Sequence, residues 1–285
     1  MGEEGRTRYH YGFYAAMKVE YDLAKAPVSY EQEKQLGEDP LRLDFLIVMK
    51  EDDTVLSDPI GSFFKKVNLF EYKSPEDGLT IDDFYKAQGY GLIYKGFDRK
   101  VNELPIEQLT LTLVRHRYPK ELFKVLRAEG YMIISDHAGI YKIEGRVSIP
   151  VQIVVSSRLP EGEYAGLKLL SGRINREDII RYTEATIISR NENIKENAGT
   201  VISVCLSANK ELGKELKEEG TMDELVREFF DKVETKMKER EENVQEESAE
   251  KMIKDNVPVS NISKWTGLSV EKITAIAKKI GAASL

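Results

Sequence analysis

Two acidic residues interrupt apolar stretches that are typical of β-strands. Asp44 lies within LRLDFLIVM, and Glu71 lies within VNLFEYK, two positions before Lys73. Side chains alternate along a strand, so Glu71 and Lys73 point to the same face of the sheet. If the two strands are neighbours, this arrangement brings Asp44, Glu71 and Lys73 together at one edge of the sheet.

Two carboxylates in an apolar setting need a partner, because burying an ionised carboxylate without one is costly. A hard divalent cation meets this need, since Mg²⁺ is held by one or two carboxylates and keeps positions for water and phosphate oxygens. A lysine beside the ion orients the attacking water or helps to deprotonate it. The alternative is structural, with both acids paired to Lys73 and Arg42 or solvated on an open sheet face.

The composition excludes several other kinds of protein. Hydrophobic residues make up 41% of the chain and charged residues 32%, which allows a core and argues against general disorder. The single cysteine, Cys205, rules out an internal disulfide. The histidines, His10, His116 and His137, lack metal-ligand spacing, and we interpret them as ordinary surface or core residues. Without a signal peptide or an apolar run near the roughly 20 residues of a membrane span, we expect a soluble cytoplasmic protein with no membrane partner.

The elements that must position the acids alternate between helical and strand patterns. Apolar residues at helical spacing predict helices over residues 9–24, 81–95 and 120–128. Alternating or continuous apolar runs predict strands over residues 28–35, 41–49, 67–73, 109–115, 131–135, 139–144 and 151–156. This order is typical of an α/β core with a mixed central sheet flanked by helices.

We divide the chain into three parts. Residues 1–160 hold the α/β core, and residues 161–247 form a helical extension with a Glu/Lys-rich arm that could form a homodimer. Residues 248–285 read as a helix, a turn with Gly267 and a last helix capped by Ser269, a pattern typical of a helix-turn-helix. The net charge is −7, but residues 259–285 carry four lysines and one acid. This tail either contacts phosphates or is a helical cap or dimerisation piece.

Asp44 in its apolar strand, followed by Glu71-Tyr72-Lys73 and then a helix, resembles the PD-(D/E)xK nuclease superfamily. The longer run NLFEYKSPEDGLTIDDFYKAQGYGLIYKG resembles its transposase-associated, recombination-promoting nucleases and related bacterial proteins, and the resemblance covers residues 9–156. It implies a restriction-endonuclease-like core and a DNA endonuclease that uses Mg²⁺, with Mn²⁺ as an alternative ion. It also implies that Asp44, Glu71 and the main-chain carbonyl of Tyr72 hold the metal, and that Lys73 positions the attacking water.

The resemblance implies two further catalytic residues, both on helices. The family often carries an acid on the first helix, for which Glu20 is the candidate, with Glu31 and Glu33 of the next strand as rivals. It often carries a polar residue on the helix after the E-x-K strand. Gln88 fits that place, and Tyr85 lies on the same helical face.

Two positions depart from the family patterns. Leu43 precedes Asp44 at the position where the PD-(D/E)xK pattern has proline, and that position supplies no metal ligand. Leu92 stands where the Gln-x-x-x-Tyr pattern of exonuclease-like members has tyrosine, which argues against that activity. The acidic net charge argues against tight DNA binding. One alternative is therefore a catalytically inactive module that keeps the nuclease fold and binds nucleic acid or protein, and another is an interaction protein assembled through the arm.

Overall fold

A computed structural model describes residues 3–35, 42–49, 54–97, 100–171, 174–209, 211–212, 216 and 224–280. The contacts of the chain fall into two units, Met1–Met222 and Asp223–Leu285. The first unit holds a sheet and the helices around it. The described part of the second unit is helical.

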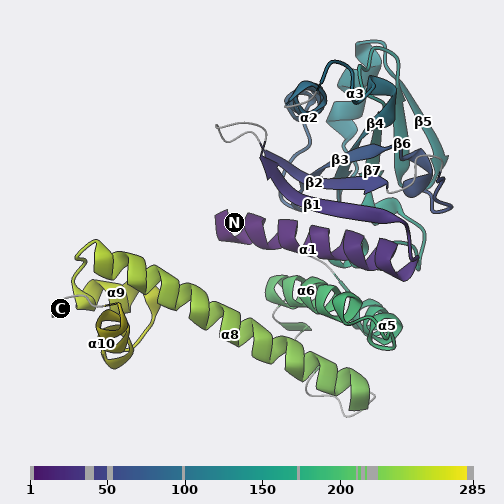
Figure 1. Ribbon diagram of the computed structural model, residues 1–285. Helices are drawn as coiled ribbons and strands as arrows, with labels where there is room; N and C mark the ends of the chain where they lie inside the picture. Colours follow the sequence, from purple (N-terminus) through teal and green to yellow (C-terminus); the bar gives the residue numbers. More distant parts are fainter. Residues whose placement is uncertain are drawn as a thin grey trace. The chain divides into compact units, whose positions relative to one another are not determined.

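Among the described residues of the first unit, seven strands form one mixed sheet in the order β1-β2-β3-β4-β7-β6-β5 (Figure 1). The strands are β1 (Val28–Gln35), β2 (Arg42–Met49), β3 (Val67–Lys73), β4 (Leu109–Arg115), β5 (Met132–His137), β6 (Ile140–Glu144) and β7 (Val151–Val155). β4 runs parallel to both β3 and β7, and the other neighbours are antiparallel. Parallel neighbours need a crossover, which α2 (Ile81–Gly96) provides between β3 and β4.

α1 (Glu3–Leu23) covers one face of the sheet. Its apolar residues recur at helical spacing and form a stripe that packs against the strands. The ring of Phe13 stacks on that of Tyr72 in β3, with centroids 4.7 Å apart. Phe13 also meets the rings of Phe45 in β2 and Phe70 in β3. These strand residues therefore face α1, and the residues that alternate with them face the other way.

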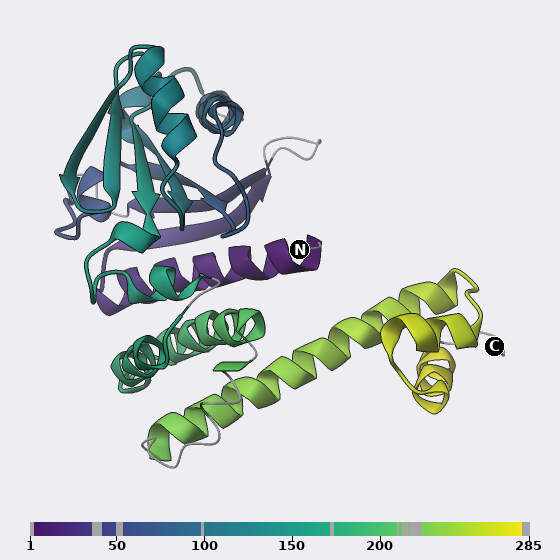
Figure 2. The same ribbon diagram turned by 180° about the vertical axis from the view of Figure 1, so that it is seen from behind.

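α2 and α3 (Lys120–Ala128) cover the opposite face of the sheet, as both views show (Figures 1 and 2). The core on this side joins leucines of three neighbouring strands to aromatic residues of both helices: Leu46, Leu69, Leu111, Leu113, Phe84 and Phe123. α2 begins with a capping box, in which Thr80 and Asp83 satisfy each other's backbone N–H groups. The cap fixes the start of α2 at the end of the connection 74–80 that follows β3.

The first unit has three further helices, α4 (Ala165–Leu169), α5 (Arg176–Ile187) and α6 (Glu192–Ala208). Of these, α5 and α6 lie on the side of α1 that faces away from the sheet (Figure 1). α6 approaches α1 closely at Gly12, where an added Cβ would lie 3.2 Å from Val204. Cys205 is fully buried in α6, and burial raises the pKa of its thiol to about 12. Its predicted role as a small core residue is confirmed.

The second unit has a hydrophobic core of its own. It consists of α8 (Glu224–Lys254), α9 (Val259–Thr266) and α10 (Val270–Lys279). The end of α8 packs on the two short helices through Ala249, Ile253, Ile262, Ile273 and Ile276. Between α9 and α10 the chain turns at Gly267, whose φ of 74° is a left-handed conformation that favours glycine. The side chain of Ser269 then accepts the N–H of Lys272 and caps α10.

The predicted α/β architecture with a mixed sheet flanked by helices, followed by C-terminal helices, is confirmed. Most predicted bounds fall within two residues of the observed ones. The first helix differs, because it begins at Glu3 and not at residue 9. No helix in the described part of the chain is both long and apolar enough to cross a membrane.

Candidate active site

The pairing of β2 with β3 brings Asp44 and Glu71 to facing positions. The antiparallel register runs from Val48↔Val67 to Phe45↔Phe70. Asp44 and Glu71 are the next residues along their strands. At such a position on an antiparallel pair, Cβ atoms lie about 5 Å apart. The two acids predicted from separate stretches of sequence are therefore neighbours.

The carboxylate of Asp44 also contacts the main chain of β3. Its Oδ2 atom accepts the N–H of Tyr72 at 2.8 Å. The N–H and C=O groups of one strand residue point to the same side of the strand, as in a pair that exchanges both bonds. The carbonyl of Tyr72, predicted as a third metal ligand, therefore points toward the strand that carries Asp44.

Lys73 joins Glu71 to the first turn of α2. Its Nζ atom lies 3.1 Å from Oε1 of Glu71 and 2.9 Å from Oδ1 of Asp83. Burial works to lower the pKa of Lys73, but Glu71 and Asp83 outweigh it and raise that pKa. Lys73 therefore stays a charged ammonium at neutral pH. It can donate hydrogen bonds to a water or a phosphate oxygen, but it is a poor base.

Glu71 is the most perturbed carboxyl group of this site. Its side chain is 13% exposed. Burial and the nearby charge of Asp44 raise its pKa to about 7, against the opposing effect of Lys73 and Lys86. Two carboxylates that resist ionising together are a setting that a divalent cation relieves. The donor set of two carboxylates and a carbonyl fits Mg²⁺, which completes its shell with water.

α1 adds His10, which the sequence analysis treated as an ordinary residue. Its Nδ1 atom lies 3.4 Å from Oδ1 of Asp44. Burial opposes protonation of His10, but Asp44 and then Glu71 outweigh it and raise the pKa of the imidazole. The signal that could have identified His10 is its position one turn before Phe13 and Tyr14 on the buried stripe of α1.

The rival acids of β1 lie at different distances from Asp44. Glu31 pairs with Leu46, two residues farther along β2. Glu33 lies between the pairs Gln32↔Phe45 and Lys34↔Leu43, so it is level with Asp44 on the neighbouring strand. Its φ of 47° is a left-handed conformation that costs a non-glycine residue about 1 kcal/mol or more. Glu33 is exposed, in contrast to Glu71.

Gln88 uses its side-chain amide within the fold. Its Nε2 donates to the carbonyl of Ile149, and its Oε1 accepts the N–H of the same residue. Ile149 lies two residues before the strand β7, so this pair of bonds ties α2 to the start of β7. Any role of Gln88 at the site would have to be combined with this structural one. Tyr85, on the outer side of α2, donates instead to Glu129.

Glu20 belongs to a different group of side chains. It lies about 15 Å along α1 from His10, at 1.5 Å per residue. Burial, followed by the charges of Asp58 and Glu163, raises its pKa to about 7. The structure therefore does not bring Glu20 to Asp44 and Glu71.

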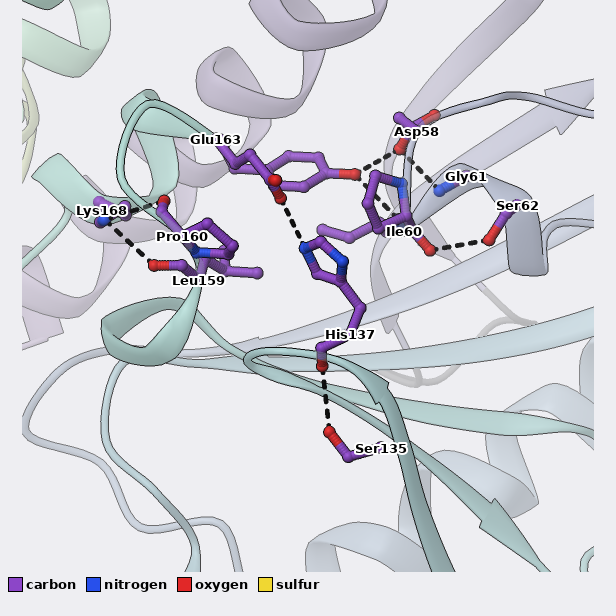
Figure 3. A network of polar contacts seen from close by, with 12 residues as sticks. Asp58, Ile60, Gly61, Ser62, Ser135, His137, Leu159, Pro160, Glu163 and Lys168 are labelled. Atoms are coloured by element: carbon purple, nitrogen blue, oxygen red, sulfur yellow. Dashed lines mark hydrogen bonds and ion pairs between the residues drawn. The ribbon is translucent and has the colours of Figure 1, made fainter.

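Figure 3 shows the polar network that surrounds this second group. Tyr164 donates its hydroxyl to Oδ1 of Asp58 at 2.5 Å and accepts the buried N–H of Ile60 at 2.8 Å. Oδ1 of Asp58 also accepts the N–H of Gly61, a position where an added Cβ would lie 2.2 Å from the same carboxylate. Nearby, His137 and Glu163 form a 2.7 Å contact. The network ties the chain between β2 and β3 to the segment after β7.

The basic residues near the site are few. Lys86 of α2 lies close enough to Glu71 to lower its pKa. Lys65 and Lys66 precede β3, at the opposite end of the strand, about 15–20 Å from Glu71 at 3.3 Å per residue. They lie too far along the strand to touch the same phosphate as Lys73.

Comparisons of the chain with protein-family models, with curated proteins and with solved structures found no match. Within the described ranges, no three histidine, cysteine, aspartate or glutamate side chains form a group that could hold a metal ion. The side-chain ligands of the candidate site are therefore two carboxylates, and the remaining ligands would be a carbonyl, waters and substrate.

Proposed function

We propose that the chain is a Mg²⁺-dependent DNA endonuclease of the PD-(D/E)xK type, built on a restriction-endonuclease-like core. The observation that carries this proposal is the juxtaposition of Asp44 and Glu71 on facing positions of β2 and β3, with Lys73 on the same face as Glu71. The raised pKa of Glu71 supports it, because burial and the nearby charge of Asp44 oppose ionisation of Glu71, and a bound cation would relieve both effects.

Each residue of the site has a distinct part in phosphodiester hydrolysis. Asp44 and Glu71 would hold Mg²⁺, together with the carbonyl of Tyr72. The bound ion would activate a water and stabilise charge on the scissile phosphate. Lys73, held as an ammonium by Glu71 and Asp83, would donate to the attacking water and fix its approach in line with the leaving oxygen. Asp83 orients Lys73 from the capped start of α2.

The C-terminal unit would hold the DNA. Its two short helices, joined by a short turn that contains Gly267, have the element order of a helix-turn-helix, in which the second helix enters the major groove. Lys264, Lys278 and Lys279 are exposed and available to phosphates. Lys272, in the first turn of α10, contacts Glu246 and Glu242 of α8 at 3.0 and 3.5 Å, so its charge is already partly neutralised.

The test of the enzyme is nicking of supercoiled plasmid DNA in Mg²⁺ and in Mn²⁺, with EDTA as the metal-free control. We compare the wild type with Asp44→Ala, Glu71→Gln and Lys73→Met. Loss of a preorganised donor lowers a rate by about 100-fold or more. The matched control is Lys236→Met, which removes the lysine of another E-x-K triplet on α8. Equal nicking by wild type and the three site variants would exclude this enzyme.

The alternative function is a catalytically inactive module that keeps the fold and binds nucleic acid or protein. Its specific support is the ion pairing of Lys73, which would hold α2 against β3 whether or not a metal binds. In that case Lys73→Met would lower the melting temperature, and the wild type would show no metal-dependent nicking.

The DNA-binding role of the tail has a convenient reporter. Trp265 is the single tryptophan of the chain, and it is 61% exposed at the end of α9. Binding of duplex DNA to this unit should change its fluorescence, and binding should weaken as salt rises. Deletion after residue 247 also removes Trp265, so binding by the truncated chain is measured by the anisotropy of fluorescently labelled duplex DNA, and it should be lost. Binding that persists unchanged in the truncated chain would exclude the helix-turn-helix role.

A further inference from the structure

We infer that His10 is the residue through which α1 serves the candidate site, by holding Asp44 in the orientation in which it binds the metal. His10 is a positioning residue in this account, because it acts on the ligand and does not touch the ion. The inference rests on the proposed function, since it gives α1 a part in the same metal site.

The first argument is that both oxygens of Asp44 have a partner. Oδ2 accepts the N–H of Tyr72 at 2.8 Å, and Oδ1 lies 3.4 Å from Nδ1 of His10. A carboxylate with a partner at each of its two oxygens is held in one orientation, whereas a carboxylate with a partner at one oxygen can rotate about that contact. Each carboxylate oxygen has two lone pairs, so contact with a donor leaves capacity for a cation.

The second argument is that the ring of His10 is itself held in place. It meets the ring of Tyr72 edge to face, with centroids 5.5 Å apart, and that of Tyr14 at 6.4 Å. Tyr72 is in turn stacked on Phe13, one turn along α1 from His10. Tyr72 therefore binds Asp44 through its main chain and His10 through its ring, so one strand residue sets the relative position of both groups.

The third argument is that the other candidate residues do not contact Asp44 from α1. Glu20 lies about 15 Å away along α1 and is surrounded by Asp58 and Glu163. Glu33 is level with Asp44, but it lies on β1 and is exposed. Among the described residues of α1 whose side chains are placed, His10 is the one whose polar atoms contact Asp44.

The chemistry is that of a hydrogen-bonded metal ligand. Groups that hold the ligands of a metal fix their geometry, and losing such a group weakens metal binding by about 10- to 100-fold. The neutral form of His10 suffices, because its Nδ1–H can donate to Oδ1 of Asp44 while Asp44 carries the negative charge toward the ion.

The test is calorimetric titration of the full chain with Mn²⁺, with four substitutions compared against the wild type. His10→Asn places an amide N–H near the position of Nδ1, and His10→Gln places it near Nε2 instead. His10→Phe keeps the ring packing and has no donor. The matched control is His137→Phe, since His137 contacts Glu163 and lies on β5, at the opposite edge of the sheet from β1. The melting temperature without metal shows whether each variant folds.

We expect His10→Phe and His10→Gln to weaken Mn²⁺ binding about 10- to 100-fold, while His10→Asn stays within about threefold of the wild type. The pair of Asn and Gln variants decides the matter even if His10→Phe fails to fold. Binding by His10→Gln that equals or exceeds the wild type would overturn the inference, as would equal losses in His10→Asn and His10→Gln.

Failure of the proposed function has a different signature. Asp44→Asn, titrated in the same series, should abolish the heat of binding. A wild type that binds no Mn²⁺, or an Asp44→Asn variant that binds it as tightly as the wild type, would overturn both the metal site and the role of His10. An intact Asp44 dependence with no effect of His10 would overturn the role of His10 alone.

Discussion

Glu71 and Glu20 are two carboxyl groups of the first unit with similar pKa values, and they lie in opposite kinds of surroundings. Burial is the main cause in both cases, and it raises each pKa to about 7. Around Glu71 the structure places one acid, Asp44, and two lysines, Lys73 and Lys86. Around Glu20 it places two acids, Asp58 and Glu163, and the hydroxyl groups of tyrosines.

The comparison teaches that a raised pKa alone does not define a metal site. Burial and Asp44 oppose ionisation of Glu71, but Lys73 and Lys86 act against them, so the charged form of Glu71 has cationic partners. The influences that act on Glu20 all raise its pKa. We therefore interpret the surroundings of Glu71 as a candidate cation site. We interpret Glu20 as a carboxyl group that its surroundings favour in the protonated form.

The largest expected effect is stabilisation of the wild type by metal. At free Mg²⁺ of about 100 times its dissociation constant, the free energy of unfolding should rise by about 2.7 kcal/mol, because the ion binds only the folded state. Urea unfolding with and without Mg²⁺ measures this rise. Glu71→Gln should abolish it and Glu20→Gln should leave it intact. If Glu20→Gln abolished the Mg²⁺-dependent rise in the free energy of unfolding, the metal would bind near Glu20 and not at Glu71.

The next effect is the pH dependence that Glu20 contributes to stability. Because its pKa is raised in the folded state, the folded chain binds a proton more readily than the unfolded chain between about pH 4.5 and 7. Stability therefore falls as pH rises through this window. Glu20→Gln removes that fall, and it should stabilise the protein by about 2 kcal/mol at pH 8 and by little near pH 4.5.

Thermal unfolding over this pH range measures the effect of Glu20→Gln. Glu184→Gln, at an exposed position on α5, is the matched control and should change neither the level nor the slope. A gain from Glu20→Gln that is the same at every pH would show that the carboxyl group is not the cause.

A smaller effect is expected from Tyr164→Phe. The change removes the acceptor for the buried N–H of Ile60 and the donor to Asp58, and it should cost about 1.5 kcal/mol. Tyr182→Phe is the matched control, because the hydroxyl of Tyr182 is buried and makes no hydrogen bond to the described residues. Equal losses of stability in the two variants would argue against this network as the link between the segments.

The smallest effect concerns the tail. Replacing Glu242 and Glu246 by glutamine frees Lys272 for a phosphate, so the salt dependence of DNA binding should steepen by about one unit of slope. Fluorescence titration of Trp265 at several salt concentrations measures the slope. An unchanged slope would show that Lys272 faces away from DNA. The Glu239→Gln change, at an exposed position on the same helix, serves as the control.

Local patterns were sufficient to predict most of the fold. The strands at residues 28–35, 67–73 and 109–115 have the predicted bounds, because alternation and turn residues are properties of adjacent positions. The same alternation placed Glu71 and Lys73 on one face. The candidate pair of Asp44 and Glu71 also followed from the sequence, once the two strands were assumed to be neighbours.

The remaining features depend on contacts between distant parts of the chain. The amide of Gln88 bonds to Ile149, and Tyr164 bonds to Asp58, which no local pattern reveals. The sequence also could not show which part of α1 lies over the site. Both Glu20 and His10 are on that helix, and only the packing of Phe13 on Tyr72 places His10 there.

The most direct test of the account is a crystal structure of the full chain grown with Mn²⁺ and measured at a wavelength where manganese scatters anomalously. We predict an anomalous peak between the carboxylates of Asp44 and Glu71, within about 2.3 Å of an oxygen from each. A peak located instead among Glu20, Asp58 and Glu163, or no peak between Asp44 and Glu71 at saturating Mn²⁺, would contradict the account.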